Sequence, residues 1–427
     1  MVKNTAKVIG RVRSSAFLRH NAVYFFGSLA ASALNYLYYP VLGHLLKLAD
    51  YGEVQALVAL SLQLAIFITV LSQVTVNVAA TYNETDKRRV AFELEKLALF
   101  ISVFVFVVGS IFSWKLRDFF NFSSIWPFIV LLVVLVVTGP SSFRAAYLNG
   151  HKKFGITSLY NILIASSRLV FSALFVLIGW GAIGAILGLV VAQILAFIYT
   201  AYQAGKLGFG DAPGLKYFSM PDLRLVLPEL KYGLFVFASS MGITLMSSMD
   251  IFVVKHYFDA TTAGRYAGVS AVARILFILT APIAQVLLPS VRKTRPAQEN
   301  HNYLFRSLAL LLGIGGAALL GFTLLPRFVV GVLMGGNYTP YSHLLPTLSL
   351  AMFMMSALNL IIYYHIALRH YQMCAIVILG MVGTAALMAL RHSSLLLIIN
   401  NLVWGSVAMF GLFLAWGLWR AVQAERS

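Results

Sequence analysis

Three charged side chains lie well inside long apolar stretches of this sequence. Asp250 falls within the stretch 232–257, and Arg274 and Arg168 fall within similar stretches. An unpaired charge in hydrocarbon costs several kcal/mol, so such residues usually face a partner or a wet cavity. Every other carboxylate lies in or beside a predicted loop, which makes Asp250 the one acid expected deep inside an apolar segment.

The two arginines suit an anionic ligand that carries phosphate. A guanidinium group is planar and can donate to two phosphate oxygens at once. Arg274 has a candidate partner in Asp250 on the adjoining helix, either as a structural clamp or as a pair that a ligand separates. Arg168 lies near the middle of its stretch, and it is predicted either to bind phosphate or to form a structural pair between helices.

Three further residues complete the predicted binding set. Arg144 lies near the end of its apolar stretch, where it either contacts the ligand or extends to the membrane surface. Gln73 and Gln285 occupy equivalent places in an internal repeat, although most polar residues in such stretches bond across helices. The predicted substrate-binding residues are therefore Arg168, Arg274, Asp250, Arg144, Gln73 and Gln285.

The elements that must position these residues are transmembrane helices. The 427-residue chain is 60% hydrophobic and 11% charged, whereas soluble domains are about half apolar and about a quarter charged. A span needs about 20 apolar residues. Short loops separate the apolar stretches, which predicts an all-α polytopic membrane protein with about 12 transmembrane helices. The twelve stretches are 21–46, 54–80, 97–113, 125–148, 156–180, 182–204, 232–257, 262–290, 304–325, 341–368, 371–390 and 394–419.

The distribution of basic residues predicts the orientation of these helices. With the N-terminus inside, 23 of the 32 Lys and Arg residues fall in inner segments, seven in outer segments and two within spans. Cytoplasmic loops of membrane proteins carry such an excess. Both termini are therefore predicted to be cytoplasmic. This bias, together with anionic lipids, explains the net charge of +18 better than nucleic-acid binding does.

The longest inner loop divides the predicted spans six and six. This loop, 206–230, separates an N-terminal lobe, 1–205, from a C-terminal lobe, 231–427. Gly52 and Gly264 lie 212 residues apart, and each precedes a Gln-Val pair by 21 residues. We therefore predict two six-helix lobes related by a pseudo-twofold axis along the membrane normal.

Three segments carry a resemblance to a known family. They are LLKLADYG from Leu45 to Gly52, the pattern Asp250-x13-Gly264-Arg265-Tyr266-Ala267 followed by Pro289, and the stretch Val332 to Tyr338. With these motifs and this topology, the chain resembles the polysaccharide (O-antigen type) flippases of the multidrug/oligosaccharidyl-lipid/polysaccharide exporter superfamily. The resemblance covers most of the chain.

That resemblance implies two lobes around a central cavity and transport by alternating access. The implied substrate is a polyprenyl-diphosphate-linked oligosaccharide, moved from the inner to the outer leaflet of a bacterial or archaeal cell membrane. Membrane lipids, a glycan polymerase and glycosyltransferases are the implied partners, without nucleic acid. No cofactor is implied beyond a coupling ion, whose identity the sequence leaves open.

Three alternative functions need different residues. An enzyme needs catalytic acids, a metal site or a catalytic motif, and the sequence contains no DxD, HExxH, GxSxG or P-loop motif. A single cysteine, Cys374, and scattered histidines offer no evident metal-ligand set. A cation-coupled drug exporter of the same superfamily depends on an internal carboxylate, which the first six predicted spans lack. A non-transporting scaffold of a glycan-assembly complex stays an alternative.

Overall fold

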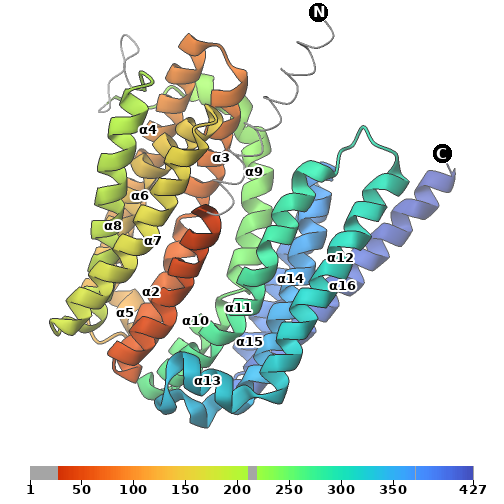
Figure 1. The fold of residues 1–427 in the computed structure, drawn as a ribbon. Helices are drawn as coiled ribbons and strands as arrows, with labels where there is room; N and C mark the ends of the chain where they lie inside the picture. Colours follow the sequence, from red (N-terminus) through yellow and green to blue (C-terminus); the bar gives the residue numbers. More distant parts are fainter. Residues whose placement is uncertain (1–26, 210–218, 371, 427) are drawn as a thin grey trace, which may run out of the picture. The chain divides into compact units, whose positions relative to one another are not determined.

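Every secondary-structure element in the described part of the chain is a helix. The computed structural model describes residues 27–209, 219–370 and 372–426 (Figure 1). Residues 27–45 are helical. The helices that follow are α2 (Leu48–Leu64), α3 (Ile66–Thr81), α4 (Glu84–Ile111), α5 (Ser113–Phe119), α6 (Trp126–Gly150), α7 (Phe154–Leu177), α8 (Gly181–Gly205), α9 (Leu223–Met246), α10 (Met249–Tyr257), α11 (Ala260–Ser290), α12 (Ala297–Leu324), α13 (Pro326–Met334), the 3₁₀-helix η1 (Gly336–Leu344), α14 (Leu345–Ala367), α15 (Met373–Leu390) and α16 (Leu395–Arg426).

Most of these helices are long and apolar enough to cross a membrane. Within the described residues nine qualify singly, and up to eleven qualify if each of two bent helix pairs forms one span. Large apolar side chains such as Phe104 and Leu414 are exposed, as a lipid environment allows. The chain is therefore a polytopic helical membrane protein, as predicted. The count of twelve stays a prediction, because the first predicted span begins outside the described residues.

Contacts divide the chain into two units, and each unit contains separate segments. The first unit comprises Met1–Leu45, Phe67–Lys115 and Ser124–Gly233, and the second comprises Leu46–Ile66, Leu116–Ser123 and Leu234–Ser427. Helix α2 and the end of α5 therefore pack with helices from the second half of the sequence. The predicted lobes, 1–205 and 231–427, and their pseudo-twofold relation stay predictions.

In the first unit, α6 packs against α4 and α8, and α8 also packs against α7 (Figure 1). Helices α7 and α8 approach closely at Gly188, where a Cβ atom would overlap the backbone of Ser172. The Ser172 hydroxyl donates to the Ala185 carbonyl at 2.7 Å. Small residues and interhelical hydrogen bonds are typical of membrane helix pairs, since lipid removes the hydrophobic drive for helices to associate.

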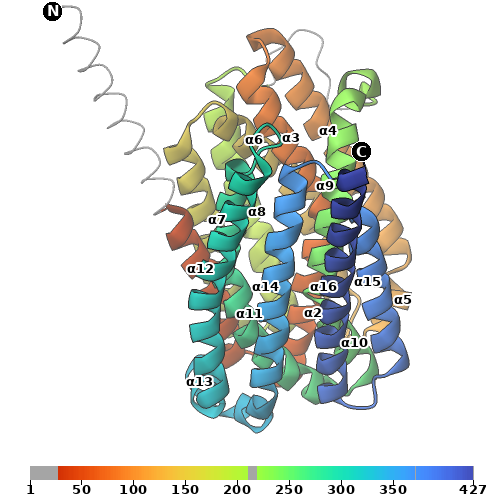
Figure 2. The ribbon, with the colours of Figure 1, turned by 90° about the vertical axis from the view of Figure 1, so that its right-hand side faces the viewer.

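In the second unit, α11 is the central helix and packs against α2, α12 and α14. Figure 2 shows α11, α12 and α14 running along one another. Gly264 of α11 lies against α2, because a Cβ atom there would overlap the Leu48 carbonyl. A Cβ atom on Gly52 would in turn lie 3.0 Å from the Gly264 amide nitrogen. The two glycines that indicate the repeat therefore meet at one close helix crossing.

Two predicted spans are each broken into two helices. Helices α2 and α3 are bent by 43° at Ala65, and α9 and α10 are bent by 47° at Ser247 and Ser248. A broken helix at membrane depth is tolerated where protein or a water-filled cavity satisfies the freed backbone groups. The second break lies beside Asp250, one of the predicted site residues.

Three helices begin earlier than hydropathy predicts. Helix α2 begins at Leu48 rather than 54, α4 at Glu84 rather than 97, and α9 at Leu223 rather than 232. The helical start of α9 also shortens the predicted inner loop 206–230. Between α10 and α11, the predicted loop 258–261 shrinks to residues 258–259.

Capping side chains explain why such polar first turns are helical. Asn83 accepts a hydrogen bond from the Asp86 amide at 2.9 Å, and Asp259 accepts from the amides of Thr261 and Thr262 at 3.0 Å. Hydrogen bonding to Thr262 also holds the pKa of the Asp259 carboxyl below its usual value. Caps satisfy amides that have no partner inside the helix, whereas hydropathy records only that these residues are polar.

Candidate functional site: two arginines in apolar helices

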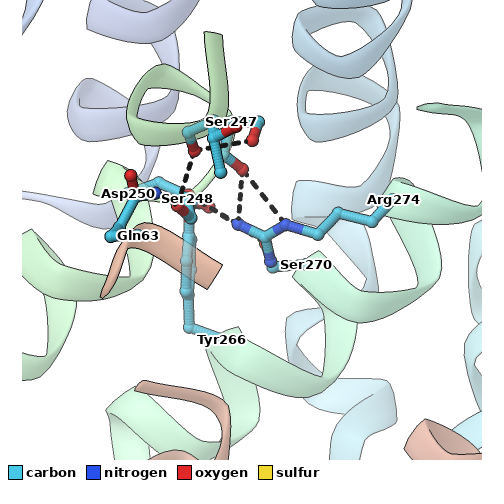
Figure 3. A network of polar contacts seen from close by, with 8 residues as sticks. Gln63, Ser247, Ser248, Asp250, Tyr266, Ser270 and Arg274 are labelled. Carbon is cyan, nitrogen blue, oxygen red and sulfur yellow. Dashed lines mark hydrogen bonds and ion pairs between the residues drawn. The ribbon is translucent and has the colours of Figure 1, made fainter. Parts of the chain in front are cut away.

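The break between α9 and α10 creates an acceptor for Arg274. The Ile251 amide bonds to the Ser248 carbonyl, so the Ser247 carbonyl loses its usual helical donor. Arg274 on α11 donates to this carbonyl from Nε at 3.2 Å and from Nη2 at 3.0 Å (Figure 3). The arginine therefore satisfies a backbone group that the broken helix leaves open.

Asp250 is fully buried and is held by three side chains of α11. Its Oδ1 accepts from Arg274 Nη2 at 2.7 Å, and its Oδ2 accepts from the hydroxyls of Tyr266 and Ser270, both at 2.9 Å. Ser270 also accepts from Arg274 Nη1 at 2.7 Å. The predicted pair of Asp250 and Arg274 is thus present, with the additional hydrogen bonds that buried charges require.

The spacing of the α11 residues is a signal that the charge-based prediction missed. Tyr266, Ser270 and Arg274 lie four residues apart and therefore share one face of the helix. Gln63 of α2 extends the network by donating to the Ser248 hydroxyl at 2.9 Å (Figure 3). The network therefore joins α2, the break between α9 and α10, and α11 within the second unit.

Arg168 of α7, in the first unit, has a different environment. Its guanidinium carbon lies 3.7 Å from the centre of the Tyr38 ring and 6.0 Å from that of Tyr39. Its Nε and Nη2 atoms are buried and have no hydrogen-bond partner in the described structure, and the same holds for the Tyr36 and Tyr38 hydroxyls. A cation–π contact stabilises the guanidinium through the ring face and does not use its N–H donors.

Arg144 of α6 is held by a buried acid. Its Nε lies 3.4 Å from Oε1 of Glu95 on α4, and its guanidinium lies 4.6 Å from the centre of the Phe197 ring. Glu95 is fully buried. Glu95 is therefore a buried acid that the sequence places beside a predicted loop, in the charged segment that the early start of α4 makes helical. Whether Arg144 also contacts a ligand or extends to the membrane surface stays a prediction.

A further acid and a lysine are buried in the second unit. Glu53 of α2 accepts from the amide and the hydroxyl of Ser123 at 2.7 and 3.2 Å. Lys255 of α10 is 1% exposed, lies 5.5 Å from the centre of the Phe122 ring, and has no hydrogen-bond partner for its amine among the described residues. The sequence places both at the edges of predicted spans, Glu53 before the stretch 54–80 and Lys255 near the end of 232–257. They are buried because the segment Leu116–Ser123 packs with this unit.

The role of the repeat glutamines stays a prediction. Gln73 on α3 is exposed. The side chain of Gln285 on α11 lies outside the described residues.

The fold is that of known membrane transporters. The lipid II flippase MurJ in an inward closed conformation superposes with a TM-score of 0.69 at 14% identity, covering 94% of this chain and 87% of that chain. The MATE transporter VcmN of Vibrio cholerae, as a point mutant, superposes with a TM-score of 0.62 at 13% identity, covering 95% and 96%. A eukaryotic MATE transporter gives 0.60 at 12% identity, covering 93% and 96%.

The chain belongs to the polysaccharide biosynthesis protein family, whose model matches residues 17–295. The matched region contains Arg144, Arg168, Asp250 and Arg274. No curated protein matches the sequence. The family predicted from the sequence motifs is thereby confirmed, and with it a multi-span membrane protein that has a transporter fold.

Proposed function

We propose that the protein moves a polyprenyl-diphosphate-linked oligosaccharide from the inner to the outer leaflet of a bacterial or archaeal cell membrane by alternating access. Membership of the polysaccharide biosynthesis family supports the glycan part of the proposal. The fold shared with a lipid II flippase and MATE transporters supports transport. Glycosyltransferases and a glycan polymerase are the partners that this role requires.

The observation that carries the proposal is the free guanidinium edge of Arg168. Two of its nitrogen atoms are buried without a hydrogen-bond partner in the described structure. A buried donor without a partner costs about 1–3 kcal/mol, and more when charged. A diphosphate offers several charged acceptor oxygens, and an arginine edge binds two of them side by side. Such a ligand would therefore supply acceptors for two donors that have none in the described structure.

Arg274 has two alternative partners in this proposal, the Asp250 carboxylate and a phosphate group of the substrate. Asp250 holds Arg274 through a contact of 2.7 Å. A phosphate group that reaches Arg274 competes with Asp250 for the same Nη2 donor, and Tyr266 and Ser270 still donate to the released carboxylate. A ligand shifts an equilibrium by its differential affinity for the two states, so this competition couples substrate binding to the α9–α10 break.

The second candidate function is a cation-coupled exporter of the same superfamily. Exchange of protons or sodium ions needs a buried carboxylate. The structure buries Glu93 and Glu95 in the first unit and Glu53 and Asp250 in the second, whereas hydropathy indicates only Asp250. Each of these acids already has a cation or hydrogen-bond donor beside it, so we favour the flippase.

The two functions separate in one transport assay. Full-length protein is reconstituted in proteoliposomes, and movement of a fluorescent lipid-linked oligosaccharide is measured with and without a proton or sodium gradient. The flippase proposal expects movement of this lipid, and strong loss of movement in Arg168→Ala. Exchange of a cationic drug for protons or sodium, without movement of the lipid, would establish the exporter instead.

A further inference from the structure

Helix α12 is the helix least covered by the rest of the protein. Only 11% of its most apolar 18-residue window is buried, against 28–67% for the other single spans in the described structure. Large side chains along it are exposed, among them Leu310, Leu312, Leu320 and Leu324. A helix with this much exposed apolar surface lies against lipid along its length.

A hollow lies where α12 turns into α13. Its volume is about 570 Å³, and its walls are Leu324, Leu325, Pro326, Arg327, Phe328 and Thr339. Helix α13 lies at the end of the second unit opposite the C-terminus (Figure 2). The C-terminus is predicted to be cytoplasmic, so this hollow is predicted to open at the outer surface.

The short helix α13 is amphipathic and exposes its apolar residues as well. Val330 and Met334 are buried on one face, while Phe328 and Val332 are 66% and 62% exposed. Exposed apolar side chains beside an arginine, at the end of a lipid-facing span, are typical of a helix that lies in the headgroup layer of the membrane. The hollow therefore sits where lipid headgroups meet their acyl chains.

Arg327 is the charged wall of this hollow. It is exposed, and its side chain makes no hydrogen bond or ion pair with any described residue. No carboxylate occurs in the sequence between Glu299 and Glu425. No acid from this segment therefore competes with a ligand for Arg327. The Thr339 hydroxyl donates to the Gly336 carbonyl at 2.8 Å, which leaves Arg327 as the donor for an anion.

We infer that this hollow binds an anionic phospholipid, independently of the transported substrate. The lipid phosphate binds Arg327, and the acyl chains lie along the exposed leucines of α12. Both the charge and the apolar surface fit such a lipid. Arg327 has no acid beside it to compete with a phosphate group, and the surface of α12 next to it is apolar. A soluble anion would use the arginine but would leave the exposed ring of Phe328 and the α12 leucines uncovered.

The test measures lipid binding by the full-length protein in detergent, using native mass spectrometry with phosphatidylglycerol and phosphatidylcholine. We expect Arg327→Gln to lower phosphatidylglycerol affinity about fivefold, the effect of one basic residue near an anionic lipid surface. Arg391→Gln is the matched control, because Arg391 is another exposed arginine of the unit that does not line the hollow. Val332→Ser keeps the charge and should also weaken binding.

Four results would overturn the inference. They are an equal loss in Arg327→Gln and Arg391→Gln, unchanged binding in Arg327→Gln, equal affinity for phosphatidylcholine, and displacement of the lipid by inorganic phosphate. The last result would assign the hollow to a soluble anion. Unfolding temperature is measured in parallel, and it should stay constant in all three variants because each altered side chain lies outside the core.

Discussion

The two arginines show opposite ways of holding a cation inside an apolar helix. All three guanidinium nitrogens of Arg274 donate, to the Ser247 carbonyl, to Ser270 and to Asp250. Arg168 instead lies over the Tyr38 ring, with two nitrogens buried and unbonded in the described structure. One arginine is saturated by the protein, and the other retains donors.

This difference separates an arginine whose donors are all used within the protein from one that has unused donors. A saturated arginine stabilises the fold and resists substitution, while a ligand must displace a partner to reach it. An arginine with unused donors contributes less to the stability of the fold. A ligand can form hydrogen bonds with it without breaking any bond within the protein. Stability measurements should therefore respond most strongly at Arg274, and transport measurements at Arg168.

The largest effect on stability is expected from Arg274→Ala. This change leaves the fully buried Asp250 with two hydroxyl donors but no cation, and it leaves the Ser247 carbonyl without a donor. Removing one partner of a buried ion pair costs about 3–5 kcal/mol. Thermal and denaturant unfolding of the detergent-purified protein should show this loss, with less protein recovered from membranes.

A double variant tests whether the loss comes from the stranded charge. Asp250→Asn with Arg274→Gln removes both charges while keeping polar groups in place, so it should recover most of the stability but not transport. If Arg274→Ala unfolds like the unchanged protein, the network does not hold the α9–α10 break. If the double variant flips substrate at the native rate, the pair is only structural.

The next effect is expected in transport by Arg168→Lys. The positive charge survives, but the edge that binds two oxygens is lost. One hydrogen bond to a charged group contributes about 1.5–3 kcal/mol, so the flipping rate should fall about tenfold or more. The free energy of unfolding should change by less than about 1 kcal/mol, because an ammonium group can still lie over Tyr38.

The contrast between the arginines requires that Arg168→Lys lowers transport and leaves stability nearly unchanged. Arg274→Lys is the matched control, since lysine cannot reach three acceptors at once and stability should fall there as well. Unchanged transport in Arg168→Lys would show that Arg168 acts only as a positive charge or does not contact phosphate. A large loss of stability would show that its donors have partners in the membrane.

The fold class could be predicted from the sequence because hydropathy acts over whole helices. Twenty apolar residues in a row leave few alternatives to a span, and the family motifs around Gly52 and Gly264 fit the observed crossing of α2 and α11. The residues at which helices start or break were harder to predict from the sequence. Polar capping turns, such as that at Asn83, and the bend at Ser247 depend on local hydrogen bonds that hydropathy does not record.

The pairing at the site could be predicted only where both partners stand out. Asp250 and Arg274 are conspicuous because each is a lone charge in an apolar stretch, and they lie on neighbouring helices. Glu95 and Lys255 were missed because the sequence places each beside a predicted loop, where solvent is expected. Their burial comes from tertiary packing between segments that are distant in sequence, which no local pattern encodes.

A smaller effect on stability is expected from Tyr266→Phe. The change removes only the hydroxyl that donates to Asp250 at 2.9 Å. Because the acceptor is a buried carboxylate, the loss should be about 1.5–3 kcal/mol, with Ser270 and Arg274 still holding the acid. Unfolding of the purified variant measures this loss. A variant as stable as the unchanged protein would mean that Asp250 is satisfied without Tyr266.

The smallest effect is expected from Tyr38→Phe, the matching change at the other arginine. The Tyr38 hydroxyl is buried and has no hydrogen-bond partner in the described structure, while the ring beneath Arg168 is kept. Removing an unbonded buried hydroxyl deletes a polar group without deleting a bond, so stability should stay within about 0.5 kcal/mol or rise slightly. The unfolding measurement that detects the loss in Tyr266→Phe should therefore detect no loss in Tyr38→Phe.

A loss of stability in Tyr38→Phe as large as that in Tyr266→Phe would reveal a hydrogen bond to the Tyr38 hydroxyl in the membrane and would make the two arginine sites alike. If stability holds but transport falls, the hydroxyl serves the ligand, and Arg168 and Tyr38 form one binding surface.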